Sequence, residues 1–149
     1  MRRRSDAISM QPSTTACTVA DGLIDTSVAI DWDDPAVLAG LPEGVAISTI
    51  SMAELAAGPH LAREPIEKAR RQARLQQVES LFDALDFDGA AARSYGQVVA
   101  AVAAAGRSHR SRVADLLIAA VAHSNKLALY TRNPQDFQAL DALISVVAI

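Results

Sequence analysis

The sequence has little cysteine, few aromatic residues and no long hydrophobic run. Its single cysteine, Cys17, excludes an internal disulfide bond and a zinc site made of cysteines alone. Aromatic residues form only 4% of the 149 residues although half of the sequence is hydrophobic, so the core must be mostly Ala, Val, Leu and Ile. Such a core is typical of helices packed on a parallel sheet rather than of a β-sandwich.

Two further absences limit the possible functions. No apolar run reaches the length of a membrane-spanning helix, so we expect a soluble, cytoplasmic protein with no membrane contact. The net charge of −3 at pH 7 argues against a protein that coats nucleic acid through bulk positive charge.

The chain divides into a tail and one domain. Residues 1–18 are rich in Ser, Thr and other small or polar residues, and such a composition predicts a flexible N-terminal tail. Residues 19–149 have the size of a single domain with a substantial core.

Within this domain, short apolar runs alternate with longer segments of helical spacing. The runs predict strands near 22–25, 45–50, 85–88, 127–131 and 144–149. Ser51 is expected to cap the helix after the second strand, and Gly58-Pro59 to interrupt it. Longer helices are expected at 65–85, 89–105 and 113–123. The alternation predicts an α/β fold, a three-layer α/β/α sandwich around a mostly parallel sheet of four to five strands.

Four acidic residues follow the predicted strands on the side of their carboxyl ends. Asp25 ends the first strand, Glu54 lies one turn into the next helix, Asp115 begins the apolar helix at 113–123, and Asp136 follows the fourth strand. Because parallel strands present their carboxyl ends at one edge of the sheet, the four carboxylates can converge on one crevice.

Such a cluster needs a positive partner. Carboxylates a few ångströms apart repel each other by roughly a few kcal/mol per pair, so a fold keeps them together only around a compensating charge. Oxygen ligands without His or Cys indicate a hard cation, Mg²⁺ or Mn²⁺. Each acid also has an ordinary interpretation. Asp25 and Asp136 could cap a helix or turn, Glu54 could complete a capping box with Ser51, and Asp115 could serve only the helix dipole in the first turn of its helix.

The motifs around these acids resemble those of PIN-domain ribonucleases, and in particular VapC-type toxins of bacterial toxin–antitoxin pairs. They are Leu23-Ile24-Asp25-Thr26-Ser27, Ser51-Met52-Ala53-Glu54-Leu55, Asp115-Leu116-Leu117-Ile118-Ala119-Ala120, and Thr131-Arg132-Asn133 with Asp136-Phe137. The resemblance extends over about residues 19–149. It implies a PIN-like fold and a Mg²⁺- or Mn²⁺-dependent endoribonuclease that a cognate antitoxin inhibits.

The resemblance also implies roles for single residues. Catalytic and metal-binding roles would fall to Asp25, Glu54, Asp115 and Asp136. Polar support would come from Ser27, Thr131 and Asn133. Many PIN domains have Asp where this chain has Asn133, so either Asp136 or Asn133 supplies the fourth ligand.

Further expectations concern the partners. Arg112 and Arg132 flank the predicted crevice and are suited to guide the RNA backbone, because a guanidinium binds two phosphate oxygens at once. The apolar composition also leads us to expect a homodimer.

Two alternatives to an RNA-cleaving toxin stay open. One is a degenerate PIN domain that binds proteins without catalysis. The other is a Mg²⁺-dependent phosphoryl-transfer domain, which also gathers acids at strand ends. That alternative would require a lysine after a late strand, and the two lysines, Lys68 and Lys126, do not lie there.

Overall fold

The computed structural model describes residues 20–149, so the predicted tail at 1–18 lies outside the described residues. Five strands form one sheet in the order β3-β2-β1-β4-β5, and every neighbouring pair is parallel. The strands are β1 (Gly22–Ile24), β2 (Val45–Ser48), β3 (Asp83–Leu85), β4 (Ala128–Thr131) and β5 (Val146–Ala148). This arrangement confirms the predicted parallel α/β sheet.

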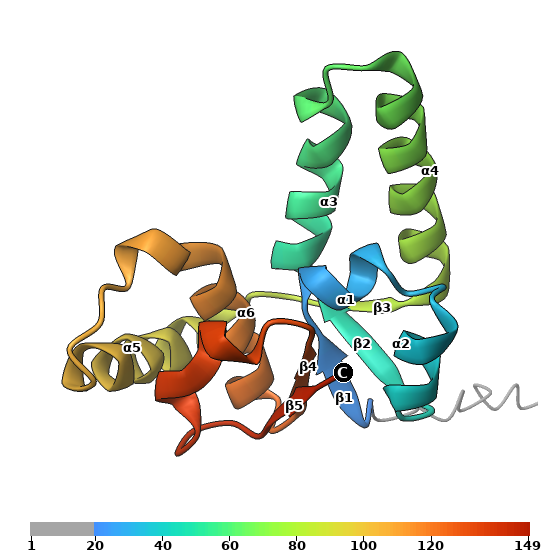
Figure 1. Cartoon of the computed structure of the whole chain (residues 1–149). Helices are drawn as coiled ribbons and strands as arrows, with labels where there is room; N and C mark the ends of the chain where they lie inside the picture. The colour runs from blue at the N-terminus through green and yellow to red at the C-terminus, as the bar shows by residue number, and fades with distance from the viewer. Residues whose placement is uncertain (1–19) are drawn as a thin grey trace, which may run out of the picture.

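Helices connect the strands and cover the sheet (Figure 1). The α-helices are α1 (Thr26–Ile30), α2 (Pro35–Gly40), α3 (Thr49–Leu61), α4 (Pro65–Leu81), α5 (Gly89–Ala104) and α6 (Val113–Ser124). Two 3₁₀ segments, η1 (Arg110–Arg112) and η2 (Pro134–Leu140), lie before α6 and after β4.

The alternating side chains of the strands divide the core into two parts, one on each face of the sheet. Leu23 and Leu129 are fully buried in a cluster with α5, α6 and η2. Ile24 and Ile47 are fully buried in a second cluster with α1, α2, α3 and α4. Helices therefore cover both faces, as the predicted three-layer arrangement requires.

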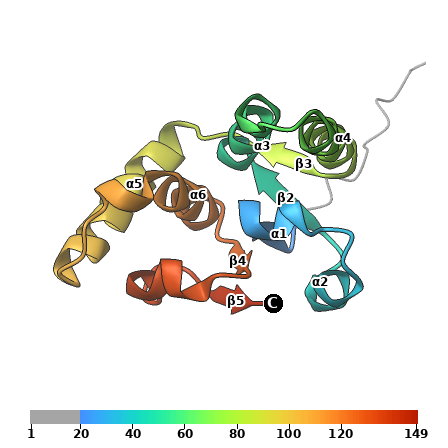
Figure 2. The same cartoon turned by 45° about the horizontal axis from the view of Figure 1, so that its top comes forward.

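The hairpin of α3 and α4 stands away from the rest of the molecule as an arm (Figure 1), and Figure 2, which looks nearly along this arm, shows its two helices side by side. Its outer end carries Leu61 and Ile66, whose side chains are 73% and 76% exposed. The arm and the lobe formed by α5 and α6 lie on two sides of an inner corner, and the carboxyl end of β1 leads into this corner.

Several predicted boundaries were wrong. The cap of α3 is Ser48, whose hydroxyl oxygen accepts a hydrogen bond of 3.1 Å from the backbone N–H of Ser51, so Ser51 lies inside the helix. Gly58-Pro59 does not interrupt α3 either. Pro59 is buried within the helix, and the Gly58 carbonyl in its last turn accepts a 2.9 Å hydrogen bond from Arg71 on α4.

Smaller differences concern β3 and α2. Strand β3 begins at Asp83, two residues before the predicted run, and α4 accordingly ends at Leu81. The short helix α2 was not predicted. It begins at Pro35, where a proline needs no N–H partner, and Asp34 caps it through the N–H of Ala36. None of the helices in residues 20–149 is long and apolar enough to cross a membrane.

Candidate active site

Asp25 is the most firmly held of the four acids. It follows β1, is only 4% exposed, and accepts a 3.1 Å hydrogen bond from the N–H of Val28 as the cap of α1. The hydroxyl of Ser27 donates to its Oδ1 at 2.6 Å, and the hydroxyl of Thr131 donates to its Oδ2 at 2.5 Å. The capping interpretation is therefore correct, and it leaves the carboxylate fixed at the carboxyl end of the central strand.

The loop after β4 orients both of these hydroxyls. The backbone N–H of Arg132 donates to Ser27 Oγ at 3.1 Å, and that of Asn133 donates to Thr131 Oγ1 at 2.9 Å. Since each hydroxyl oxygen accepts a backbone hydrogen, its own hydrogen is directed to Asp25. Ser27 and Thr131 thus have the supporting contacts expected of them. For Asn133 the structure shows a backbone position before η2 and no side-chain hydrogen bond among the described residues.

Glu54 lies on the second turn of α3 and is held by Thr26, which directly follows Asp25. The Thr26 hydroxyl donates to Glu54 Oε1 at 2.6 Å, and it also lies 3.0 Å from Ser51 Oγ. Because Ser48 rather than Ser51 caps the helix, Glu54 is not part of a capping box. No site role was predicted for Thr26, although its sequence position, a hydroxyl residue directly after a strand-ending acid, was a signal for one.

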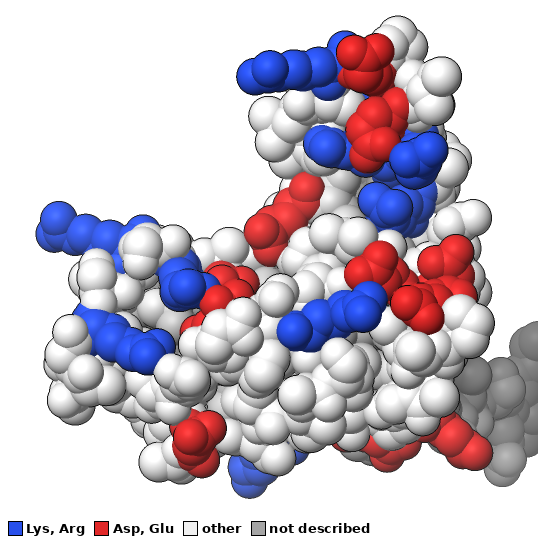
Figure 3. Space-filling view, viewed as in Figure 1, with Lys and Arg blue, Asp and Glu red and all other residues white. Residues whose placement is uncertain are grey.

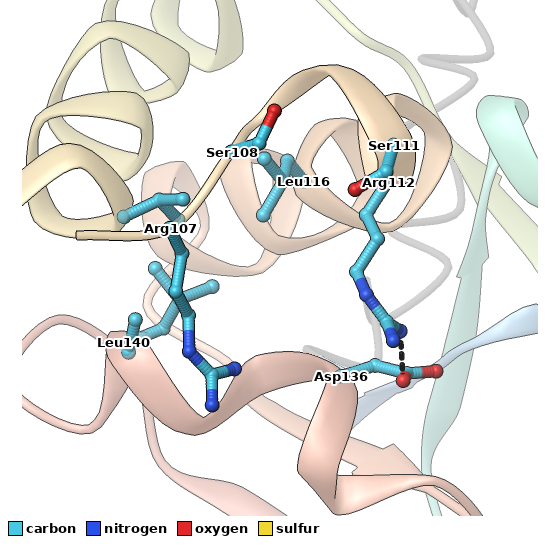
Figure 4. A pocket seen from close by; sticks show the side chains of 9 residues that line it. Arg107, Ser108, Ser111, Arg112, Leu116, Asp136 and Leu140 are labelled. Carbon is cyan, nitrogen blue, oxygen red and sulfur yellow. Dashed lines mark hydrogen bonds and ion pairs between the residues drawn. The ribbon is translucent and has the colours of Figure 1, made fainter. Parts of the chain in front are cut away.

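Asp136 comes from η2 and forms an ion pair with Arg112 of η1 (Figure 4). The Asp136 side chain is 20% exposed and that of Arg112 is 46% exposed. The pairing of a predicted metal ligand with a predicted RNA-guiding residue was not foreseen. Arg132 points elsewhere and pairs with Asp31 at 2.8 Å and Asp34 at 3.8 Å.

Asp115 connects the four acids electrostatically. It lies in the first turn of α6 and is partly buried. Desolvation raises its pKa from 3.8 to about 6, and the negative charges of Asp136, Glu54 and Asp25 contribute to this rise, whereas Arg112 opposes it. All four acids therefore share one environment with an excess of negative charge. In Figure 3, acidic side chains lie in the inner corner beside the arm, and basic side chains lie around it.

The donor set suits a hard divalent cation in its chemistry, since it consists of carboxylate and hydroxyl oxygens and its four acids outnumber the one arginine paired with them. The side chains are not in coordination geometry. Within residues 20–149, no group of three or more His, Cys, Asp or Glu side chains is placed to hold a metal ion. The carboxylates of Asp25, Glu54 and Asp136 are instead held by hydroxyls or by a guanidinium of the same chain.

Comparison with known proteins agrees with this architecture. The family model of the PIN domain matches residues 22–143. Ribonuclease VapC5 of Mycobacterium tuberculosis is 38% identical over 134 residues, which cover 89% of this chain and 96% of the relative.

Solved structures give the same result. The crystal structure of VapBC-5 from M. tuberculosis, a member of the VapBC family of toxin–antitoxin systems, contains a chain with 38% identity and a TM-score of 0.73; the match covers 86% of this chain and 96% of that one. A chain of FitAcB from Neisseria gonorrhoeae matches at 32% identity and a TM-score of 0.69, over 83% and 94% of the two chains. By its family match, its fold and the identity to these relatives, this chain belongs to the PIN-domain family.

Proposed function

We propose that this protein is the toxin of a toxin–antitoxin pair and acts as a metal-dependent endoribonuclease in the cytoplasm. The observation that carries the proposal is the electrostatic coupling of Asp115 to Asp25, Glu54 and Asp136 at the carboxyl ends of the strands. The relatives named ribonucleases and the toxin–antitoxin structures of similar fold support the choice of RNA and of an antitoxin partner.

Asp25, Glu54, Asp115 and Asp136 would hold Mg²⁺ or Mn²⁺, with Ser27, Thr131 and Asn133 as polar neighbours. When bound, a divalent ion would supply the positive charge that activates a water molecule and neutralises the phosphodiester. Asp25 or Asp115 would orient the attacking water. Because water attacks rather than the ribose 2′-hydroxyl, we expect products with 5′-phosphate and 3′-hydroxyl ends.

Arg112 and Arg132 would guide the RNA backbone. The side chains of both are partly exposed, at 46% and 37%, and each is paired with a carboxylate of the same chain. Phosphate groups of an RNA strand would compete for these guanidiniums, since phosphate offers the same bidentate acceptor geometry.

The experiment is cleavage of a pool of short single-stranded RNAs by the purified protein in Mg²⁺, in Mn²⁺ and in EDTA. We expect cleavage that depends on the metal, and its loss in Asp115→Asn. Full cleavage by folded Asp115→Asn would overturn the assignment. If the wild type cleaves no RNA in Mg²⁺, in Mn²⁺ or in EDTA but still binds the antitoxin, the result would instead favour a PIN domain that only binds proteins.

The antitoxin is expected in the groove between the arm and α1. Thr26, Glu54, Gly58, Arg71 and Arg74 are among the residues that line this groove, whose volume is about 520 Å³. It reaches from the candidate active site along the arm, so a bound segment would cover Glu54. We also propose that the toxin forms a homodimer.

A further inference from the structure

We propose that a second cavity, between the loop that joins α5 to α6 and the segment η2, binds one nucleotide of the RNA strand next to the cleaved bond. The base would rest on the apolar floor of the cavity, and the phosphate would lie between Arg107 and Arg112. This inference rests on the proposed function, because it assigns part of the substrate to a place beside the candidate active site.

The cavity has a volume of about 380 Å³, at the lower end of the roughly 300–1,000 Å³ usual for small-molecule sites. Its floor is formed by Val102, Leu116 and Leu140, which are buried apolar side chains of α5, α6 and η2. Its rim is polar and basic, with Arg107, Ser108, Ser111 and Arg112 around the opening (Figure 4). An apolar floor under a rim of cations and hydroxyls matches a nucleotide, which has a flat base at one end and an anion at the other.

Contacts of the fold hold Arg107 at this rim. Its backbone N–H donates to the Val102 carbonyl at 3.0 Å, and Gly106 before it has a φ of 72°, which a glycine adopts without strain. Its Nη2 donates to Gln138 Oε1 of η2 at 2.7 Å. Arg107 thus spans the cavity opening from the loop to η2 and keeps further N–H groups for an acceptor.

The cavity also adjoins the acidic cluster. Asp136 lines it and is one of the four acids that share the environment of Asp115. A strand whose cleaved bond lies at these acids would place a neighbouring nucleotide at the cavity. The acids repel phosphate, and Arg107 and Arg112 supply opposite charge where the next phosphate would lie.

Recognition at this cavity would make cleavage depend on the neighbouring base. The Ser108 and Ser111 hydroxyls can each donate or accept a hydrogen bond with a base edge, and the floor admits a base of limited size. The cavity is therefore expected to set the sequence preference of the enzyme, whereas the four acids perform the same reaction on any phosphodiester.

The test uses fluorescence anisotropy in EDTA to measure how short single-stranded homopolymeric RNAs bind to the full-length protein. Every protein tested carries Asp115→Asn, and each variant adds one further substitution. Arg107→Gln removes a rim charge, and Arg110→Gln is the matched control, since Arg110 belongs to the same loop but does not line the cavity. Ser111→Leu and Ala139→Leu fill the cavity from two sides. Ser111 is exposed at the rim, so that variant tests the floor even if Ala139→Leu destabilises the fold.

We expect Arg107→Gln to weaken RNA binding about tenfold and to reduce the slope of log affinity against log salt by about 1, with a smaller effect of Arg110→Gln. The cavity-filling variants should reduce the differences in affinity among the homopolymers, and with Asp115 intact they should change which sequences are cleaved. Equal effects of Arg107→Gln and Arg110→Gln, with unchanged base preference in both filled variants, would overturn the proposal. So would variants that bind RNA normally but resist the antitoxin, because the cavity would then be a protein contact.

Failure of the proposed function gives a different result. If the wild type cleaves no RNA with Mg²⁺ or Mn²⁺ while the cavity variants still alter RNA binding, the nucleotide site stands and the nuclease assignment falls. If the wild type cleaves RNA and the cavity variants share its affinities and its cleaved sequences, the nuclease assignment stands and the nucleotide site falls.

Discussion

Asp25 has a structural role as the cap of α1, and the proposed function gives the same side chain a chemical role. Its carboxylate caps the N-terminus of α1 by accepting a hydrogen bond from the Val28 N–H, and the hydroxyls of Ser27 and Thr131 donate to its two oxygens. A carboxylate with three donors is fixed in one orientation before any ligand arrives. The hydroxyls are themselves oriented by the backbone after β4, so the position of Asp25 depends on the junction of β1 with β4.

Replacement of Thr131 by Val tests this arrangement. The change keeps the shape of a fully buried residue but removes the donor to Asp25 and the acceptor of the Asn133 N–H. Because buried polar groups then lack partners, we expect the free energy of unfolding to fall by about 1–3 kcal/mol and RNA cleavage to fall as well. Urea denaturation and cleavage assays measure the two effects. Thr131→Ser keeps the hydroxyl and is the control; equal losses in both variants would contradict the role of the hydrogen bonds.

Asp115 predicts a pH dependence of stability in metal-free buffer. Its pKa in the folded protein, about 6, exceeds the ordinary 3.8, so between these values the folded protein binds more protons than the unfolded chain. The free energy of unfolding should therefore fall as the pH rises from about 4 to 6.

Asp115→Asn removes this dependence. At neutral pH in EDTA we expect the variant to be more stable than the wild type, by about 1 kcal/mol because water screens a partly buried group, and the difference should vanish near pH 4. Thermal unfolding across this pH range measures it. A variant with no advantage at neutral pH would show that the charges near Asp115 are compensated in the folded protein.

Which parts of the site could be predicted depends on the range of the interactions. The positions of Asp25 after a strand and of Asp115 in the first turn of a helix were predicted correctly, because each follows from a local pattern. Thr26 was missed because its contact with Glu54 joins residues 28 positions apart. The ion pair of Arg112 with Asp136 spans 24 positions and joins two irregular segments, to which no periodic pattern applies.

At the scale of elements, strands and long helices followed from hydrophobic spacing, and their ends did not. Ser48 and Ser51 are both suitable caps, and the helix begins at the earlier one because β2 ends there. Gly58-Pro59 looked like a helix break, since proline lacks the N–H that helix interiors use. The prediction failed because Pro59 is buried within α3 and Arg71 of α4 donates a hydrogen bond to the Gly58 carbonyl.

The two 3₁₀ segments provide a prediction about metal binding. Arg112 of η1 forms an ion pair with the carboxylate of Asp136 of η2. A metal cation that binds at the four acids must therefore compete with this guanidinium. We expect Arg112→Gln to raise the affinity for Mn²⁺ about two- to fivefold, as for a partly exposed ion pair, and Asp136→Ala to lower it strongly. Asn133→Ala should lower it less, because a neutral amide is a weaker ligand than a carboxylate.

Isothermal titration with Mn²⁺ measures these affinities. Arg132→Gln is the control for a general loss of positive charge, because Arg132 pairs with Asp31 and Asp34 instead. The gain from Arg112→Gln should disappear in an Asp136→Ala background if the two side chains act as a pair. An unchanged affinity in Asp136→Ala would remove this residue from the site.

At the scale of the whole molecule, the arm of α3 and α4 determines what can reach the acids. The candidate site lies in the corner between the arm and the α5–α6 lobe. Residues of α1 and of the arm line the groove, whereas residues of α5, α6, η2 and the loop before α6 line the nucleotide cavity. The arm also has charge pairs of its own: within α4, a hydrogen bond from Arg71 lowers the pKa of the partly exposed Glu67 carboxyl. Arg71 also donates to the Gly58 carbonyl of α3, so this side chain links the two helices of the arm.

The outer end of the arm leads to the prediction about assembly. Leu61 and Ile66 are exposed at 73% and 76%, the highest values among the large exposed hydrophobic residues of 20–149, and a monomer would leave both in water. If two copies associate through this end, multi-angle light scattering at micromolar concentration should give twice the 15.7 kDa mass of the chain. Leu61→Ser combined with Ile66→Ser should shift the protein to the monomer without loss of stability, since neither side chain is buried in the chain itself. Leu38→Ser on α2 removes a 50% exposed side chain away from the arm and should leave the dimer intact. A wild type that is monomeric at this concentration would refute the homodimer, and a dimer that survives the double substitution would place its interface elsewhere.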